Sequence, residues 1–297
     1  MAHTVITPDQ PITEAGRFMM ADELATLQSY WPDLRLSAEV TAVHETRKAI
    51  RRTFTLFKLF TPYFAPEVLQ EHQAGLRKLM GHLAPCRDAA VFRLRLAAYN
   101  EAADRPLRDL ASYWDNRQTK VDGQLRRYLS RKSVIRIIDR YAAFAGTEGA
   151  GLPGASEKNA PLLVRHALPT LIFQRMGAVR AWGELLPAAT PKQFHQLRIQ
   201  FKELRYTLNF FEDILTLNAG SIIDLSRRIQ DHLGELNDAS VASDLLKNVN
   251  QPHVEAAIYR GFQQAELSRL TADFLPLYTE FDQPEIRHEL AVGVVNL

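Results

Sequence analysis

A histidine and a row of cations occur twice in the chain, spaced so that each set lies on one side of a helix. In the second set, the histidine is followed by three cations at intervals of three or four residues. At about 100° per residue, these side chains fall within a stripe about 80° wide, and the adjacent face is apolar. The first set begins 151 residues earlier and repeats the first three residues in type and the first two intervals in spacing. The sets are His44, Arg47, Arg51 and Lys58, and His195, Arg198, Lys202 and Arg205.

Fixed rows of guanidinium and ammonium groups are suited to an anion that carries many negative charges. Charge-assisted hydrogen bonds from the planar fork of arginine are strong, and a rigid helix orders the cations before binding. Arg77 and Arg227 recur 150 residues apart in the segments that follow, and we expect them to extend the rows. The candidate binding residues are His44, Arg47, Arg51, Lys58, Arg77, His195, Arg198, Lys202, Arg205 and Arg227.

The composition is that of an ordinary globular chain. The 36 basic and 34 acidic side chains leave a net charge of +2, so any positive surface must come from where the cations lie. Cys86 is the single cysteine, which excludes an internal disulfide and a cysteine zinc site and fits a reducing compartment. There is no run of 18 apolar residues and no secretory pattern at the N-terminus. We therefore expect a cytoplasmic protein without a membrane partner.

Helical periodicity predicts an all-α fold, since no segment alternates apolar and polar residues over the length of a strand. For the second histidine helix we expect Thr190 as the cap and Pro191 in the first turn. Asp88 and Asp238 are expected to cap the helices that follow them. The predicted helices cover about 13–30, 38–60, 66–83, 87–103, 107–145 with a possible break at Gly123, 162–186, 191 onward, 222–236, 238–249, 252–277 and 284–294.

A glycine- and proline-rich stretch at 146–161 predicts a boundary between two halves. The duplication extends beyond the histidine helices, because His82 and Asp88 recur 150 residues later as His232 and Asp238. Each half is long enough for a four-helix bundle, so we expect two bundles related by an approximate two-fold axis. The expected organisation is a lead-in at 1–11, a domain at 12–281 with bundles at about 12–145 and 162–281, and a tail at 282–297.

The ordered motifs resemble the CHAD domain, the conserved histidine α-helical domain. The pattern His-x-x-Arg-x-x-x-Lys-x-x-Arg-Tyr at 195–206 is followed by Ile-Gln-Asp-His-Leu-Gly-Glu-Leu-Asn-Asp at 229–238, and residues 44–52 and 87–88 look like the first-half counterparts. The resemblance covers about residues 12 to 281. It implies two four-helix bundles around a basic central cleft that binds inorganic polyphosphate, and association with polyphosphate granules.

One departure from the repeat concerns the cations themselves. Phe54 occupies the first-half position that corresponds to Arg205. We therefore expect the two halves of the cleft to differ in basicity. The chain resembles a stand-alone version of the family, because it lacks the Glu-x-Glu-x-Lys pattern of the triphosphate-tunnel domain to which some members are fused.

Catalysis is not predicted, because no paired carboxylates, phosphate-cradling glycine loop or activated nucleophile accompanies the cations. No cofactor is expected. One alternative is binding to the phosphate backbone of nucleic acid, although the aromatic residues lie on the apolar faces rather than where bases could stack. Another is a metal-binding scaffold that uses the paired histidines. His44 and His195 either contact phosphate or make structural hydrogen bonds, whereas His82 and His232 are interpreted as structural.

Overall fold

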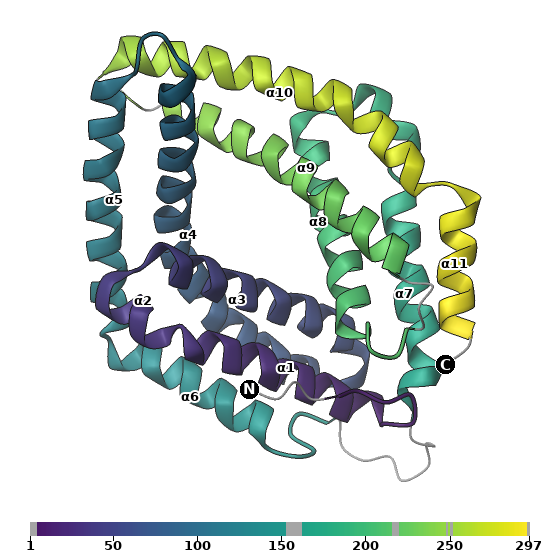
Figure 1. Ribbon diagram of the computed structural model, residues 1–297. Coiled ribbons are helices and arrows are strands. Elements are labelled where there is room, and N and C mark those ends of the chain that lie inside the picture. The colour runs from purple at the N-terminus through teal and green to yellow at the C-terminus, as the bar shows by residue number, and fades with distance from the viewer. Residues whose placement is uncertain (1–4, 153–161, 216–219, 248, 250–251, 296–297) are drawn as a thin grey trace. The chain divides into compact units, whose positions relative to one another are not determined.

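The computed structural model describes residues 5–152, 162–215, 220–247, 249 and 252–295. Within these ranges the chain forms α-helices and two short 3-10 helices and contains no β-strand, which confirms the all-α prediction (Figure 1). The chain forms two compact units, the first built on residues 10–162 and the second on residues 163–297 together with residues 6–9. The predicted linker at 146–161 lies largely outside the described residues. The two-fold axis and the shared cleft stay predictions.

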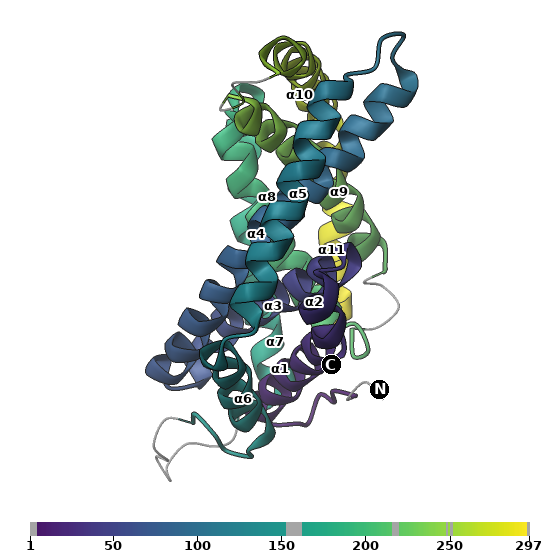
Figure 2. The same cartoon turned by 90° about the vertical axis from the view of Figure 1, so that its left-hand side faces the viewer.

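The first unit is organised around its histidine helix. Its helices are α1 (Ile12–Ser29), α2 (Trp31–Ser37), α3 (Val40–Phe60), α4 (Pro66–Ala102), α5 (Arg108–Leu129) and α6 (Lys132–Gly146), with a 3-10 turn at Thr61–Tyr63. Helix α3 packs between α1 and α4, and α6 lies on the other side of α1. Figure 2 shows α4 and α5 side by side. Because α4 packs on both α3 and α5, its side chains can meet those of the histidine helix.

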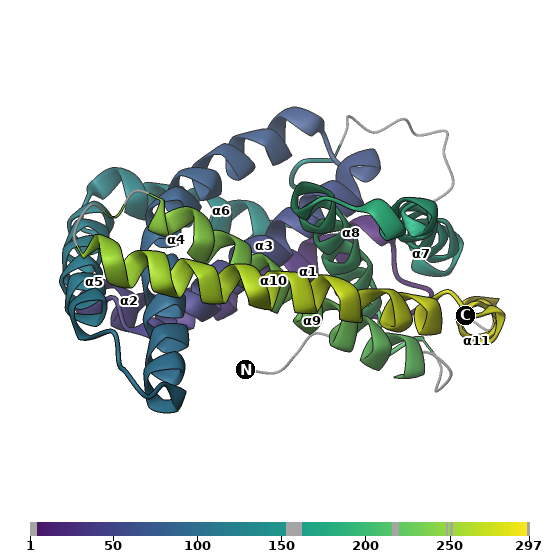
Figure 3. The same ribbon diagram turned by 90° about the horizontal axis from the view of Figure 1, so that it is seen from above.

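The second unit repeats this order of packing. Its helices are α7 (Val164–Arg180), α8 (Pro191–Phe210), α9 (Gly220–Leu246), α10 (His253–Phe281) and α11 (Pro284–Val295), with a 3-10 helix at Gly183–Ala188. Helix α8 packs between α7 and α9, and α9 and α10 run side by side (Figure 3). The segment predicted as a tail contains α11, which packs on α7 and α9. Each histidine helix therefore lies between the first helix of its unit and the long helix that follows it.

The duplication is visible in burial as well as in sequence. Each of the eight buried positions of α1 lies 152 residues before a buried position of α7. The pairs are Ile12 and Val164, Ala15 and Ala167, Gly16 and Leu168, Met19 and Leu171, Met20 and Ile172, Glu23 and Arg175, Leu24 and Met176, and Leu27 and Val179. The two helices therefore present the same face to their neighbours.

The predicted breaks inside the long helices are wrong. Helix α4 continues across Pro85, and α9 continues through position 237, so Asp88 and Asp238 lie within helices and cap nothing. Buried Leu83, Cys86 and Ala89 continue one apolar face past the proline, and this packing favours an unbroken helix. Pro85 is on the exposed side, where water can satisfy the carbonyl that lacks its usual N–H partner.

Two further boundaries also differ from the prediction. The segment after residue 107 breaks at Ser130, between α5 and α6, rather than at Gly123. Gly123 has open space where a side chain would point and no positive φ, so nothing at that position requires a break. Helix α1 ends at Ser29, close to the predicted residue 30, but it is followed by α2, which was not predicted; Pro32 lies in the first turn of α2, where a missing N–H is tolerated.

Candidate anion-binding clusters

The first cluster consists of His44, Arg47 and Arg51 on α3 and Arg87 on α4. Arg87 and Arg51 both lower the pKa of His44, and the same two arginines lower the pKa of Arg47. The three stripe residues and Arg87 are therefore close enough to interact through their charges. Arg87 was absent from the candidate residues because a helix start was expected there. The sequence signal for Arg87 was its place directly before Asp88, because Asp88 recurs 150 residues later as Asp238.

Arg47 is the most unusual member of the first cluster. It is only 7% exposed, and its Nε and Nη1 have no hydrogen-bond partner among the described residues. Burial, followed by the charge of Arg51, lowers the pKa of Arg47 to about 10, although Asp88 acts in the opposite direction. A buried guanidinium with unsatisfied donors destabilises the folded state. An anion that reached this side chain would supply the missing acceptors.

His44 lies in a positive environment. Burial is the largest cause that lowers the pKa of His44, and Arg87 is the next, while Glu45 raises it. Nε2 of His44 lies 3.7 Å from Oε1 of Glu45, and Nζ of Lys48 lies 3.1 Å from Oε2 of the same carboxylate. The imidazole is therefore mostly neutral at pH 7 in the absence of a ligand. A bound anion would favour its charged form.

The second cluster consists of His195, Arg198, Lys202 and Arg205 on α8, with Asn237 on α9. Nδ1 of His195 donates to Oδ1 of Asn237 over 2.8 Å, so the ring is held by a side chain rather than by a backbone carbonyl. In the neutral ring this leaves Nε2 as an acceptor, and in the charged ring as a second donor. The three cations are partly buried on one stripe. Cζ of Arg205 lies 5.3 Å from the ring centroid of Tyr206.

The start of α8 is set by the residues that the sequence indicated. Thr190 and Gln193 form a reciprocal capping box, in which Oγ1 of Thr190 accepts from the backbone N–H of Gln193. Pro191 occupies the first turn, as predicted. Phe194 and Phe201 fill the buried face and are 3% and 0% exposed. The cap and the core together fix the direction in which the cationic stripe faces.

In both clusters, the histidine interacts with the residue at the equivalent position of the following helix, which is 87 in the first unit and 237 in the second. Asn237 lies 150 residues after Arg87. Asn237 accepts a hydrogen bond from His195, and the charge of Arg87 acts on His44. The first unit lacks a counterpart of Arg205, where it has Phe54, but Arg87 supplies a cation that the second unit lacks. Each cluster therefore holds three arginine or lysine side chains. The expectation that the two halves of a cleft differ in basicity stays a prediction.

Three candidate residues lie away from these clusters. Lys58 is in the last turn of α3, about 20 Å along the axis from His44. Arg77 is exposed on α4, about 15 Å along the axis from Arg87. Nη1 of Arg227 is paired with Oδ1 of Asp224 at 2.9 Å on the surface of α9. These residues can contact a long ligand only if it extends beyond the clusters.

His82 and His232 make contacts that fit a structural role. The ring of His82 stacks on Tyr128 with centroids 3.6 Å apart. Nε2 of His232 donates to the carbonyl oxygen of Leu270 over 2.7 Å and lies near the ring of Phe274. Both histidines thus tie the helix after the histidine helix to the next one. These contacts are consistent with the interpretation of both residues as structural.

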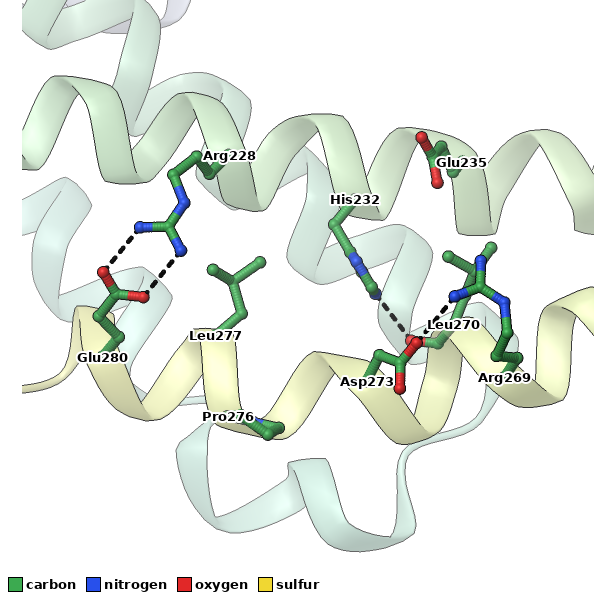
Figure 4. Close-up of a pocket in the computed structure, with 9 residues that line it drawn as sticks. All are labelled: Arg228, His232, Glu235, Arg269, Leu270, Asp273, Pro276, Leu277 and Glu280. Carbon is green, nitrogen blue, oxygen red and sulfur yellow. Dashed lines mark hydrogen bonds and ion pairs between the residues drawn. The ribbon is translucent and has the colours of Figure 1, made fainter.

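A polar cavity of about 400 Å³ lies between α9 and α10 (Figure 4). Arg228 makes two bonds to Glu280, at 2.7 and 3.0 Å, and Arg269 binds Asp273 at 2.9 Å. The charges of Arg228 and Arg269 are therefore neutralised by carboxylates of the same cavity. None of the ten candidate residues is among the described residues that line it.

Neither a metal-binding cluster nor a membrane-spanning helix is found in the described ranges. These ranges contain no group of three or more histidine, cysteine, aspartate or glutamate side chains arranged to hold a metal ion. None of the helices in the same ranges is long and apolar enough to cross a membrane.

Comparison with known proteins places the chain in a family. Residues 19–247 match the family model of the CHAD domain. The crystal structure of the CHAD domain from the plant Ricinus communis is similar, with a TM-score of 0.72 and 19% identity over 100% of this chain and 96% of that one. PptA from Streptomyces chartreusis has a TM-score of 0.65 and 13% identity, over 91% of this chain and 100% of the other. No curated protein matched the sequence. The family match over most of the sequence shows that the chain belongs to the CHAD domain family.

Proposed function

We propose that the chain binds inorganic polyphosphate through the two clusters, without catalysing a reaction on it. Membership of the CHAD family supports a polyphosphate-related role. The observation that carries the proposal for this chain is Arg47, a buried guanidinium with two donors that have no partner among the described residues. A buried, unsatisfied charge is an unfavourable feature that an anionic ligand would relieve.

The chemistry of polyphosphate suits the arrangement. Such a chain carries about one negative charge per phosphate and exposes oxygens on every side, so it is best bound by repeated cations in fixed positions. The cations of both clusters are on helices whose opposite faces are buried, which lowers the entropy lost on binding. Two clusters on one chain also allow a long ligand to bind at both, which raises its affinity above that of either cluster alone.

Nucleic acid shares the phosphate groups but needs more than cations. Proteins that bind single strands without sequence preference add exposed aromatic side chains on which bases stack. On α8 the aromatic residues next to the stripe, Phe194 and Phe201, are buried in the core of the second unit. This favours polyphosphate over nucleic acid as the ligand.

The proposal is tested by titration with long-chain polyphosphate. Wild-type protein should bind with an affinity that falls as salt is added, because ion pairing supplies most of the free energy. Replacing Arg198, Lys202 and Arg205 with alanine should reduce affinity at least tenfold, and replacing Arg51 and Arg87 should do so independently. Lys120→Ala, which removes an exposed cation of α5, is the matched control and should bind like wild type. Circular dichroism checks that each variant keeps its helicity.

Competition separates polyphosphate from nucleic acid. Single- and double-stranded DNA at the same phosphate concentration should displace polyphosphate poorly. Equal affinity for both polymers would favour the nucleic-acid alternative. Unchanged affinity in both cluster variants would contradict the proposed site, even if the wild-type protein binds polyphosphate.

Granule association in the cytoplasm is the cellular counterpart of this proposal. A fluorescent fusion of the wild-type chain should colocalise with polyphosphate granules, and a fusion that lacks both clusters should be diffuse. Colocalisation of the cluster variant would show that another surface directs it there.

A further inference from the structure

In each unit, a buried ion pair joins the first helix to the histidine helix. In the first unit, Nε of Arg52 on α3 binds Oε1 of Glu23 on α1. In the second, Nη1 of Arg175 on α7 binds Oε2 of Glu203 on α8 at 3.2 Å. The exposed fractions of the side chains are 24% and 9% for Arg52 and Glu23, and 9% and 11% for Arg175 and Glu203. Both pairs are therefore largely removed from water.

The two pairs occupy equivalent positions with their charges exchanged. Glu23 and Arg175 are related by the 152-residue offset that all eight buried positions of α1 and α7 share. Arg52 and Glu203 are related by the 151-residue offset that aligns the two cationic stripes. The first helix thus carries the carboxylate in the first unit, as Glu23 on α1, and the guanidinium in the second, as Arg175 on α7.

Most apolar positions of the first helices are much less distinctive. At the equivalent buried positions, Met19 corresponds to Leu171, Leu24 to Met176 and Leu27 to Val179. Substitutions of this kind keep the volume of a core nearly constant and are usually tolerated. At these positions, apolar packing alone would discriminate weakly between α1 and α7 as partners of α3 or α8. Gly16 is an exception, because Phe60 of α3 leaves no room there for a side chain such as that of its counterpart Leu168.

We propose that the exchanged charges direct each first helix to its own histidine helix. If α1 packed on α8, Glu23 would meet Glu203, and if α7 packed on α3, Arg175 would meet Arg52. Two like charges buried together are strongly unfavourable, whereas each native pairing joins opposite charges. These two ion pairs would prevent α1 and α7 from exchanging places, within one chain or between two copies. Chains with internal repeats are prone to such exchange.

The test uses the full chain and reverses the charges in one unit. The variant Glu23→Arg with Arg52→Glu keeps a complementary pair in the first unit but gives both units the same polarity. After refolding from urea, its monomer yield should fall several-fold, and swapped dimers or aggregates should rise, as measured by size exclusion with light scattering. Reversing the second pair as well, with Arg175→Glu and Glu203→Arg, restores the difference between units and should return the yield to the wild-type level.

Two controls keep the outcome interpretable. Glu23→Arg alone should be destabilised and should be rescued by Arg52→Glu, which shows that the reversed pair forms. Glu23→Met with Arg52→Met removes the charges of the first unit and should also increase exchange. A wild-type monomer yield for the variant reversed in one unit would overturn the proposal. So would a yield for the fourfold variant as low as that of the twofold variant.

Discussion

The two histidine hairpins, α3 with α4 and α8 with α9, place the same positions together but fill them with different chemistry. The histidine is influenced by the charge of Arg87 in the first unit and donates a hydrogen bond to Asn237 in the second. Phe54 in the first stripe corresponds to Arg205 in the second. The cation that is missing from one helix is thus supplied by its neighbour. The comparison teaches that, in this chain, the charge of a cluster depends on the helix pair rather than on one motif.

The same contrast holds in the core. Both units join the first helix to the histidine helix by an ion pair, but the pair in the second unit is shielded more evenly from water. The burial pattern repeats position by position, while the polar residues within it have exchanged or moved. Four changes test how far the two units are equivalent.

The largest expected effect comes from breaking the more buried ion pair. Arg175→Met removes the guanidinium that pairs with Glu203, and the free energy of unfolding should fall by about 3 kcal/mol. Arg52→Met should lower it less, because Arg52 is more exposed than Arg175. Urea unfolding at pH 7 measures both. The comparison would fail if the two variants were equally destabilised, and Arg175→Met with Glu203→Leu should recover most of the loss.

The next largest effect is expected at Arg47, where one substitution should raise the free energy of unfolding and lower the affinity for polyphosphate. Replacing the buried guanidinium with methionine should raise the free energy of unfolding of the ligand-free protein by about 1 kcal/mol, since an unsatisfied buried charge is removed. Affinity for polyphosphate should fall about tenfold, because charge-assisted hydrogen bonds are lost. Arg198→Met in the second cluster should reduce affinity with a smaller gain in stability. A loss of both stability and affinity in Arg47→Met would indicate a structural role.

A smaller effect is expected from making the second cluster resemble the first. Asn237→Arg would place a cation opposite His195, as Arg87 is placed opposite His44. Affinity should rise a few-fold and become more sensitive to salt, because one more ion pair forms. Gln124→Arg on the exposed side of α5 adds the same charge elsewhere and should change little. An equal gain from both variants would mean that net charge matters rather than position.

The smallest effect concerns protonation of His44. Its pKa in the folded, ligand-free protein is lowered, first by burial and then by Arg87, below the unfolded value of about 6.5. The stability it contributes is therefore present above pH 6.5 and is lost as the pH falls through the folded pKa. The free energy of unfolding should decline from pH 7 to pH 5 more in wild type than in His44→Gln. Equal declines would show that the imidazole does not titrate in this way.

Binding of polyphosphate should raise the pKa of His44, which is lowered in the ligand-free protein. A polyanion beside the imidazole favours its charged form, so binding near pH 6.5 should take up protons. Calorimetry in buffers with different heats of ionisation measures this uptake. His44→Gln should reduce it, and no reduction would place His44 away from the ligand.

Much of the fold could be predicted from the sequence because its signals are local. Helical periodicity and the absence of strand patterns gave the fold class, and Thr190 and Pro191 marked the start of α8. The continuity of α4 and α9 could not be predicted in this way. It depends on apolar faces that meet other helices, and this packing outweighs the local signals of Pro85, Asp88 and Asp238.

The cationic stripes were predicted from spacing, but the composition of each cluster was not. Arg87 and Asn237 join the histidines across a helix pair, and that contact depends on how α4 and α9 pack. The burial of Arg47 likewise depends on neighbouring helices, since spacing alone placed it at the margin of an exposed face. Residues whose role arises between helices are therefore the ones that sequence patterns missed.

The central claim is most directly tested by a crystal structure of the chain with a short linear polyphosphate. We predict phosphoryl oxygens within about 3 Å of the guanidinium nitrogens of Arg47 and Arg87, and of the cations of the second cluster. Phosphate bound only in the cavity between α9 and α10, or only at exposed arginines outside both clusters, would contradict the account.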